Sequence, residues 1–535
     1  MNKSSDDLIT HDYGEILTEK NDIGEFSQLS SEINKSHESK LVYITKDYAF
    51  NSAGDANYSK GIPIDIDGLT IDGQGHTINA NQKARIFNIK SDNVILKNIN
   101  IINGKIQENG GAIHWSGSDG TLINCQVKNS ATPNIGGGIF FQNNGKVINS
   151  NFDNNSAYFG GGLNFENEGT VINSTLKDNY ATLLGGGIYF VEKGTVLNST
   201  FTHNEGGDGG GIYFFKTGLV ENTKFNRNIA IGYGGGITSD ENLIVKNSQF
   251  TDNIGMFAAA IFFKGTGNVE NSIFKNNLAN RESGCLYFMQ DGTVENSTFT
   301  NNTASWAGAI LFDKEGIIKS STFKLNNAKT DGGAIYFNAR GDVDNSIFTQ
   351  NSANSGGGIY AKYGELSVNN SQFSNNIAKS HGNSLYITSQ KISLENLSFD
   401  KTTYDNEIYI NSPTTYVNKI VFKNEEKVTK IKTAITAKSQ TFKAKAKTKK
   451  ITITLKGNGK TLNKKKVTLK VNKKTYTAKT VKGKATFKIK LTKKGKFTAL
   501  IKFAGDSYYK ASQKKITVKI KWKWGGLTPS LFFNF

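Results

Sequence analysis

The sequence predicts an all-β protein, in which a right-handed parallel β-helix of about 14 coils precedes an antiparallel immunoglobulin-like (Ig-like) β-sandwich. Three observations support this fold class. A segment such as GGGIYF or GGAIYF recurs every 24 or 25 residues. A second segment, such as VENSTFTNN, follows it in each repeat. From residue 427 onward the repeat is replaced by short alternating strands rich in lysine.

The chain opens with a polar, acidic segment, residues 1–22, which we expect to be disordered and which lacks the apolar core of a signal peptide. Phe26, Leu29 and Ile33 follow at helical spacing and predict a helix that caps the solenoid. The run IDGLTIDGQGHTINA at 66–80 predicts the short strands and tight turns that open it. We therefore assign residues 23–425 to the β-helix and its cap.

The length of the repeat selects the architecture. Helix-pair repeats need about 33 residues or more, and the leucine pattern of a horseshoe repeat is absent, so each unit is predicted to be one coil. Coils that stack at about 4.8 Å place like residues above like. The aliphatic column runs from Ile139 to Ile359, with Ile86 and Ile113 before it and Leu385 and Ile408 after it.

Two further kinds of column are predicted to be scaffold. Phenylalanines should stack inside the solenoid, and two asparagine columns should link their side-chain amides along its axis. The glycines before each strand should need positive φ. The Phe column comprises Phe152, Phe201, Phe225, Phe250, Phe274, Phe299, Phe323, Phe348, Phe373 and Phe399, with Leu176 in the gap. The second Asn column comprises Asn155, Asn179, Asn204, Asn228, Asn253, Asn277, Asn302, Asn326, Asn351 and Asn376.

The C-terminal domain, assigned to residues 427–524 and followed by a tail at 525–535, is strongly basic. It holds 32 Lys, no Arg and one acidic residue, Asp506, a net charge of +31. The whole chain carries +20, so the rest carries −11. Lysine at the outward strand positions predicts a cationic surface that binds an anionic cell-wall polymer. Nucleic acid is the less favoured partner, because arginine is the preferred base reader and basic–aromatic interleaving is sparse.

A third column predicts a ligand-binding surface. In each Ile-Tyr-Phe strand the outer residues point inward, so the middle residue should point outward and form an exposed aromatic stripe. The hypothesis is that this stripe binds polysaccharide or a partner-cell surface by stacking. The alternative is that the rings only pair between coils and stabilise the sheet. The stripe comprises Phe140, Tyr189, Tyr213, Phe262, Tyr287, Tyr336, Tyr360, Tyr386 and Tyr409.

The combination of IDGQGHTI, GGGIYF with NSTFTNN, and FAGDSYYKAS in a lysine-rich domain resembles the adhesin-like surface proteins of methanogenic archaea. The GGAI and F-x-x-N pairing is also similar to the chlamydial polymorphic membrane proteins, a family whose members also carry a membrane β-barrel. The resemblance implies export, display at the cell surface or secretion, and attachment to cells or extracellular polysaccharide.

No catalytic residue, cofactor or metal site is expected, and no 18-residue apolar stretch predicts a transmembrane helix. The charged column that includes Glu221, Lys246 and Glu270 has mixed sign, which is typical of a solvated face. Cys125 and Cys285 are predicted to lie too far apart to form a disulfide. Two alternatives stay open, because parallel β-helices also host polysaccharide lyases and hydrolases and because the solenoid could be a passive spacer. A convergent Asp/Glu/Lys cleft would favour an enzyme.

Overall fold

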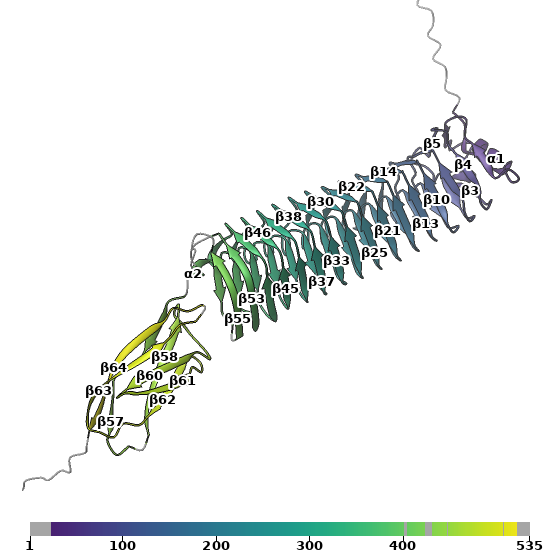
Figure 1. Cartoon of the computed structure of the whole chain (residues 1–535). Helices are drawn as coiled ribbons and strands as arrows, with labels where there is room; N and C mark the ends of the chain where they lie inside the picture. The colour runs from purple at the N-terminus through teal and green to yellow at the C-terminus, as the bar shows by residue number, and fades with distance from the viewer. Residues whose placement is uncertain are drawn as a thin grey trace, which may run out of the picture. The chain divides into compact units, whose positions relative to one another are not determined.

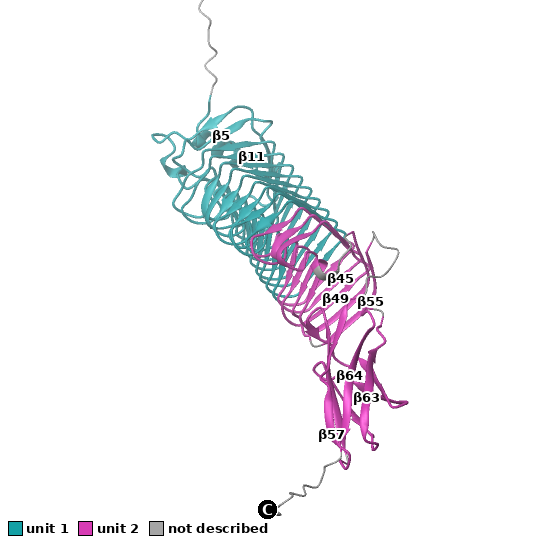
Figure 2. Ribbon diagram, turned by 90° about the vertical axis from the view of Figure 1, so that its left-hand side faces the viewer, with its two compact units in different colours: residues 1–305, 309–313 teal, residues 306–308, 314–535 magenta. Residues whose placement is uncertain are grey.

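The computed structural model describes residues 23–400, 404–412, 414–422, 431–446, 448–506 and 508–521. The segments predicted at 1–22 and 525–535 lie outside these ranges, so their expected state is not tested. The chain forms two compact units, coloured separately in Figure 2: residues 1–305 with 309–313, and residues 306–308 with 314–535.

Short parallel strands, stacked coil upon coil, form a β-solenoid of about 15 turns (Figure 1). A coil of the first unit shows how the chain passes from sheet to sheet. β24 (Ile212–Phe214) belongs to a 15-stranded sheet, and β25 (Gly218–Glu221) and β26 (Lys224–Asn226) belong to a 30-stranded sheet. β27 (Ile229–Ala230) belongs to a 10-stranded sheet, after which the next coil begins.

The 15-stranded sheet carries the aliphatic column and its strands follow in chain order. The prediction of about 14 coils was one too few, because the first strand, β3, lacks the glycine signature. Ile62 of β3 pairs with Phe87, and Phe87, not the predicted Ile86, pairs with Ile113. The strands are β3 (Ile62–Ile64), β6 (Phe87–Ile89), β9 (Ile113–Trp115), β12 (Ile139–Phe141), β16 (Leu163–Phe165), β20 (Ile188–Phe190), β24, β28 (Ile237–Ser239), β32 (Ile261–Phe263), β36 (Leu286–Phe288), β40 (Ile310–Phe312), β44 (Ile335–Phe337), β48 (Ile359–Ala361), β52 (Leu385–Ile387) and β54 (Ile408–Ile410).

The buried interior confirms the predicted Phe ladder and the second of the two predicted Asn ladders. Phe201, Phe225 and Phe250 stack with ring centroids 4.8 and 4.6 Å apart and nearly parallel planes. In the second Asn column, Asn204 Nδ2 donates to Asn228 Oδ1 at 3.0 Å, and Asn228 Nδ2 donates to Asn253 Oδ1 at 3.1 Å. Each amide is fully buried, so this ladder pairs polar groups that would otherwise be costly to desolvate.

The other polar residues that recur in the repeat shape the backbone or hydrogen-bond to it. The first Asn column, from Asn149 to Asn370 with Ser320 among its members, sits at φ between 48° and 53°. Asparagine tolerates this left-handed turn better than other side chains, so most of this column is explained by the turn and not by stacking. The serine that follows it was not singled out from the sequence. Its Oγ accepts a main-chain N–H from the preceding coil, as Ser174 does from Ser150 at 3.1 Å.

The predicted cap is present as α1 (Phe26–Asn34), whose Phe26, Leu29 and Ile33 are buried. The run at 66–80 forms β4 (Thr70–Asp72) and β5 (Thr77–Asn79), as expected. It does not open the solenoid, because β1 (Leu41–Tyr43) pairs with β4 and β2 (Tyr48–Ala49) pairs with β5.

The first glycine of most turns before the strands of the 15-stranded sheet has positive φ, as predicted, whereas the turns before β32, β36 and β40 contain no such glycine. At Gly209 φ is 63°, and an added Cβ would lie 2.3 Å from the carbonyl oxygen of Ile212. Cys125 and Cys285 are buried and free.

Residues 431–521 form two further sheets that enclose one apolar core, which includes Ile453, Leu469, Phe487 and Ile501. All pairings are antiparallel except that of β57 with β64. One sheet contains β56 (Thr433–Thr436), β58 (Lys449–Gly457), β59 (Lys460–Thr461) and β62 (Lys484–Ile489). The other contains β57 (Gln440–Lys443), β60 (Lys466–Val471), β61 (Lys474–Lys479), β63 (Gly495–Phe503) and β64 (Ser512–Lys521).

Candidate functional site

The predicted aromatic stripe lies on the outer face of the 15-stranded sheet, but it is not exposed. Phe140, Tyr213, Phe262 and Tyr336 are buried. The other five residues are half-buried: Tyr189, Tyr287, Tyr360, Tyr386 and Tyr409. The middle residue of each strand does point away from the solenoid core, so the alternation was predicted correctly and the exposure was wrong.

The stripe is covered by the segment that precedes each glycine turn. Tyr233 lies over Phe262 with ring centroids 4.3 Å apart, and Phe159 lies 5.5 Å from Tyr189. This cover could not be predicted from the repeat pattern, because the covering segments vary in residue type and in length from coil to coil. Burial of these side chains makes a long open stacking surface unavailable.

The rings also pair between coils, as the structural alternative predicted. In the second unit Tyr336, Tyr360, Tyr386 and Tyr409 follow one another with centroids 4.8, 4.8 and 4.6 Å apart. The planes of Tyr360 and Tyr386 differ by only 4°. Burial is the main reason that the pKa of Tyr360 is raised to about 12. Such pairs stabilise a parallel sheet whether or not a ligand binds.

Two tyrosines of the stripe donate hydrogen bonds to carboxylates on the next coil. Tyr213 donates to Asp240 Oδ1 at 2.8 Å, and Tyr287 donates to Asp313 Oδ2 at 2.7 Å. Lys264 Nζ lies 2.8 Å from Asp240 Oδ1 and donates to the Tyr213 hydroxyl at 3.0 Å. Burial and the neighbouring carboxylate raise the pKa of Tyr213, which keeps its hydroxyl protonated.

These carboxylates could have been found from the sequence. Each stands two residues after the middle of its strand, and side chains two apart in a strand share a face. Asp208 adds a third acidic group on this face. Burial raises the pKa of Asp208, the charge of Lys264 lowers it, and the charge of Asp240 raises it. Asp208, Asp240 and Lys264 are thus brought together although they come from three successive coils.

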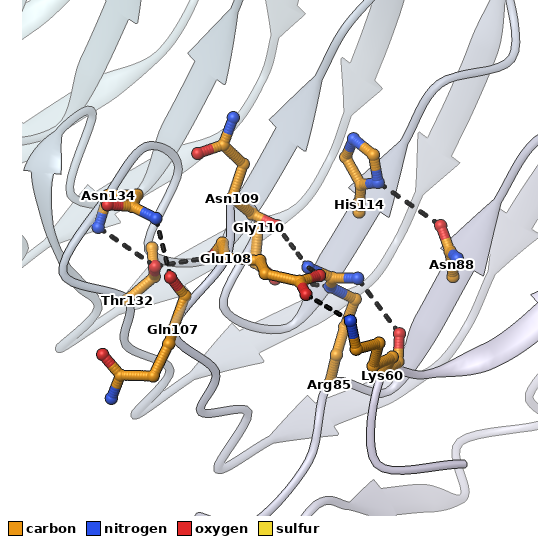
Figure 3. A network of polar contacts seen from close by, with 10 residues as sticks. All are labelled: Lys60, Arg85, Asn88, Gln107, Glu108, Asn109, Gly110, His114, Thr132 and Asn134. Atoms are coloured by element: carbon orange, nitrogen blue, oxygen red, sulfur yellow. Dashed lines mark hydrogen bonds and ion pairs between the residues drawn. The ribbon is translucent and has the colours of Figure 1, made fainter. Parts of the chain in front are cut away.

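A second polar network lies near the start of the solenoid and is structural (Figure 3). Arg85 is buried, and its guanidinium donates to three main-chain oxygens: to Gly110 at 3.0 Å, to Lys60 at 3.0 Å and to Asn109 at 2.6 Å. Glu108 lies between Arg85 and Lys60, with its Oε1 2.6 Å from Lys60 Nζ. Since these partners occupy the guanidinium, the network holds adjacent coils together and leaves few N–H groups of Arg85 to bind a ligand.

His114 borders that network and occupies the middle position of β9, between Asn88 of β6 and Phe140 of β12. Its ring stacks on Phe140 with centroids 5.3 Å apart, and Nδ1 lies 3.3 Å from Asn88 Oδ1. Burial, together with the positive charge of Arg85, lowers the pKa of His114, so the ring is neutral near neutral pH.

In the predicted mixed-charge column, Lys246 pairs with Glu270 at 3.2 Å, and both side chains are partly exposed, as expected for a solvated face.

The C-terminal domain presents lysine on the outer faces of both sheets. Three antiparallel pairs place one exposed lysine directly opposite another, and the parallel pairing of β57 with β64 places Lys443 beside Lys521, so that like charges come close. Asp506, the one acidic residue of the domain, is already neutralised, because Lys465 Nζ lies 2.8 Å from its Oδ2. Lys449 is the exception among the strand lysines, since it is buried and donates to Ala446 O at 2.7 Å. The opposed pairs are Lys450–Lys488, Lys466–Lys479 and Lys496–Lys519.

Across the described ranges, no three His, Cys, Asp or Glu side chains gather as a metal site requires. Nor does any helix of those ranges have the length and apolarity that a bilayer crossing demands.

A model described as the Chlamydia polymorphic membrane protein repeat matches residues 345–362, which is one part of one coil. No curated protein matches the chain.

Two solved structures are similar at 10% sequence identity. One is a mannuronic acid specific polysaccharide family 6 lyase enzyme from human gut microbiota, with a TM-score of 0.27 over 75% of this chain and 86% of that one. The other is the receptor-binding domain of the Siphovirus 9NA tailspike, with a TM-score of 0.25 over 89% of this chain and 87% of that one. Both likenesses are too distant to carry an inference about function. The short repeat match supports the predicted resemblance to the chlamydial repeat and no broader family.

Proposed function

We propose that this is a non-catalytic, adhesin-like protein of the cell surface or the secreted fraction. Its basic C-terminal domain, taken as Ig-like, attaches to an anionic wall polymer, and its right-handed β-helix presents a face that binds polysaccharide on a partner surface. We include in this proposal that the chain is related to the archaeal adhesin-like proteins. The observation that carries it is the set of opposed lysine pairs in the C-terminal domain.

Opposed lysines cost stability and therefore favour a polyanion. Side chains directly opposite in an antiparallel pair have Cβ atoms about 5 Å apart, where like charges repel. A carboxylate or phosphate polymer that lies across such pairs relieves the repulsion and releases its own counterions. Lysine without arginine gives a diffuse positive field, which suits attachment to a polymer of irregular sequence.

The test is the salt dependence of polymer binding by the full chain. Polygalacturonate should bind, and its affinity should fall by about tenfold or more between about 50 and 200 mM salt. Dextran, which is uncharged, should not compete for this attachment. Replacing Lys450, Lys488, Lys496 and Lys519 with glutamine should weaken binding strongly.

The matched control replaces four exposed solenoid lysines with glutamine, which changes the net charge equally: Lys146, Lys224, Lys275 and Lys324. This control should keep most of the affinity. Equal weakening in both variants would mean that net charge, and not the C-terminal surface, drives attachment. Salt-independent binding would refute the electrostatic basis.

A second candidate, a polysaccharide-active enzyme, is favoured by one observation: Asp208, Asp240 and Lys264 gather on one face of the solenoid. Burial raises the pKa of Asp208, and two carboxyl groups in different surroundings are a recurring acid–base arrangement. Release of reducing or unsaturated sugars by the intact chain, abolished by Asp240→Asn, would select the enzyme over the adhesin.

A further inference from the structure

We propose that the outer face of the 15-stranded sheet carries a subsite for an uncharged, hydroxyl-rich sugar, formed by Phe215, Asp240 and Lys264. The inference deepens the proposed function and rests on it only in taking the ligand to be a polysaccharide. It concerns a column of residues next to the predicted stripe.

The three residues occupy the same position on three successive coils. Each directly follows its strand, β24, β28 or β32, and each main-chain N–H continues the ladder: Asp240 N donates to Phe214 O at 3.0 Å and Lys264 N donates to Ser239 O at 2.8 Å. Neighbouring coils are about 4.8 Å apart. The three side chains therefore form a short row along the solenoid axis.

Phe215 supplies an open aromatic surface. Its side chain is 43% exposed, whereas the adjacent Phe214 is fully buried in the core. Lys216 Nζ lies over one face of the ring, 5.7 Å from its centroid, so the opposite face is the one offered to a sugar. A pyranose ring can stack on such a surface with its C–H groups against the aromatic carbons.

Asp240 and Lys264 supply an acceptor and a donor held side by side. Their side chains are 23% and 35% exposed, and they lie 2.8 Å apart. The hydroxyl of Tyr213, a residue that is 3% exposed, hydrogen-bonds both groups from below and fixes their positions. Two neighbouring hydroxyl groups of one sugar fit this pair, since one donates to the carboxylate and the other accepts from the ammonium.

The local charge selects an uncharged sugar over an acidic one. Lys216 and Glu241 neutralise each other at 2.8 Å. Asp240 balances Lys264, and the half-buried Asp208 adds either a negative charge or none. No net positive charge remains for a uronate or a phosphate, in contrast to the C-terminal domain.

The experiment titrates the full chain with oligosaccharides of glucose, mannose and xylose, and with an oligogalacturonate as the acidic probe, by isothermal calorimetry. At least one neutral oligosaccharide should bind. Phe215→Ala, Asp240→Asn and Lys264→Met should each raise its Kd by about tenfold or more, because each removes one element of the subsite. Tyr213→Phe should weaken binding less, since Tyr213 is a positioning residue.

Ile347→Ala is the matched control, because Ile347 is an exposed apolar residue of similar exposure (41%) on another sheet. It should bind as the unaltered protein does. Phe215 is exposed, so its replacement should not unfold the chain, and circular dichroism checks each variant. The subsite is refuted if no neutral oligosaccharide binds, if the oligogalacturonate binds more tightly, or if the control loses affinity equally.

This outcome is separable from that of the proposed attachment. The variant that lacks Lys450, Lys488, Lys496 and Lys519 should lose polygalacturonate binding and keep neutral-sugar binding. Loss of both ligands in that variant would also contradict the subsite.

Discussion

Replacing Asn228 with leucine should open the solenoid locally, because Asn228 is a central member of the buried Asn ladder. Its Oδ1 accepts from the main-chain and side-chain N–H groups of Asn204, both at 3.0 Å. Its Nδ2 donates to Phe201 O at 3.0 Å. Leucine has a similar volume but can satisfy none of these groups.

The magnitude follows from the groups left without partners. Two buried N–H groups lose their acceptor and one carbonyl loses a donor, and an unsatisfied buried group costs about 1–3 kcal/mol. We expect the free energy of local opening to fall by about 4 kcal/mol. Since about 1.4 kcal/mol is a factor of ten, amides in the surrounding coils should exchange with solvent about a thousandfold faster.

Amide hydrogen exchange is the suitable assay, because a repeat array need not unfold in a single cooperative step. Asn226→Leu is the control: it makes the same substitution two residues earlier, at a partly exposed outward position. It should change exchange by less than about twofold to threefold. An acceleration below about tenfold for Asn228→Leu, or equal acceleration in the control, would refute the ladder energetics.

Three further changes test other parts of the structure. Arg85→Leu strips three main-chain oxygens of their donor and should cost about 3 kcal/mol in thermal unfolding, whereas the exposed Lys83→Leu should be nearly neutral. Gly209→Ala should cost more than Gly75→Ala, because both have positive φ but only at Gly209 would Cβ meet a carbonyl oxygen; equal losses would contradict this. Burial opposes ionisation of Asp506, but hydrogen bonds from Lys465 and two main-chain amides lower its pKa overall. Its stabilisation is therefore present above its ordinary pKa of 3.8 and lost on acidification, so Asp506→Asn should lower the melting temperature near neutral pH and not in strong acid. A melting-temperature gap that persists in strong acid would count against this assignment.

Much of the fold followed from the sequence because its columns are nearly invariant. Phe225, Asn228 and Gly209 recur at one spacing, and a stack of equivalent coils is the arrangement that gives every copy the same surroundings. The first coil was missed for the same reason, since β3 contains Ile62 and Ile64 without the glycine signature.

The candidate site was harder to predict, because exposure depends on residues outside the repeat pattern. Tyr213 and Phe262 point outward as expected, yet the variable segment that contains Tyr233 covers this face. Asp240 and Lys264 stand at a column position where residue type varies from coil to coil, and the Tyr213 hydrogen bond depends on side-chain reach between adjacent coils. Periodicity predicts the position of each Cα atom and the face of the sheet to which its side chain points, whereas the contacts of that side chain depend on neighbours that do not repeat.

The equivalence of the coils has a consequence for how the protein can change in length. Gly194 pairs with Gly218, Val196 with Val220 and Phe201 with Phe225, so residues 24 positions apart are interchangeable in the ladder. Deleting residues 195–218 would join two chain segments in the same register and shorten the solenoid by about 4.8 Å. Such a gene could gain or lose whole coils by recombination between its own repeats, and the reach of the protein would vary in fixed steps while the local structure stayed the same.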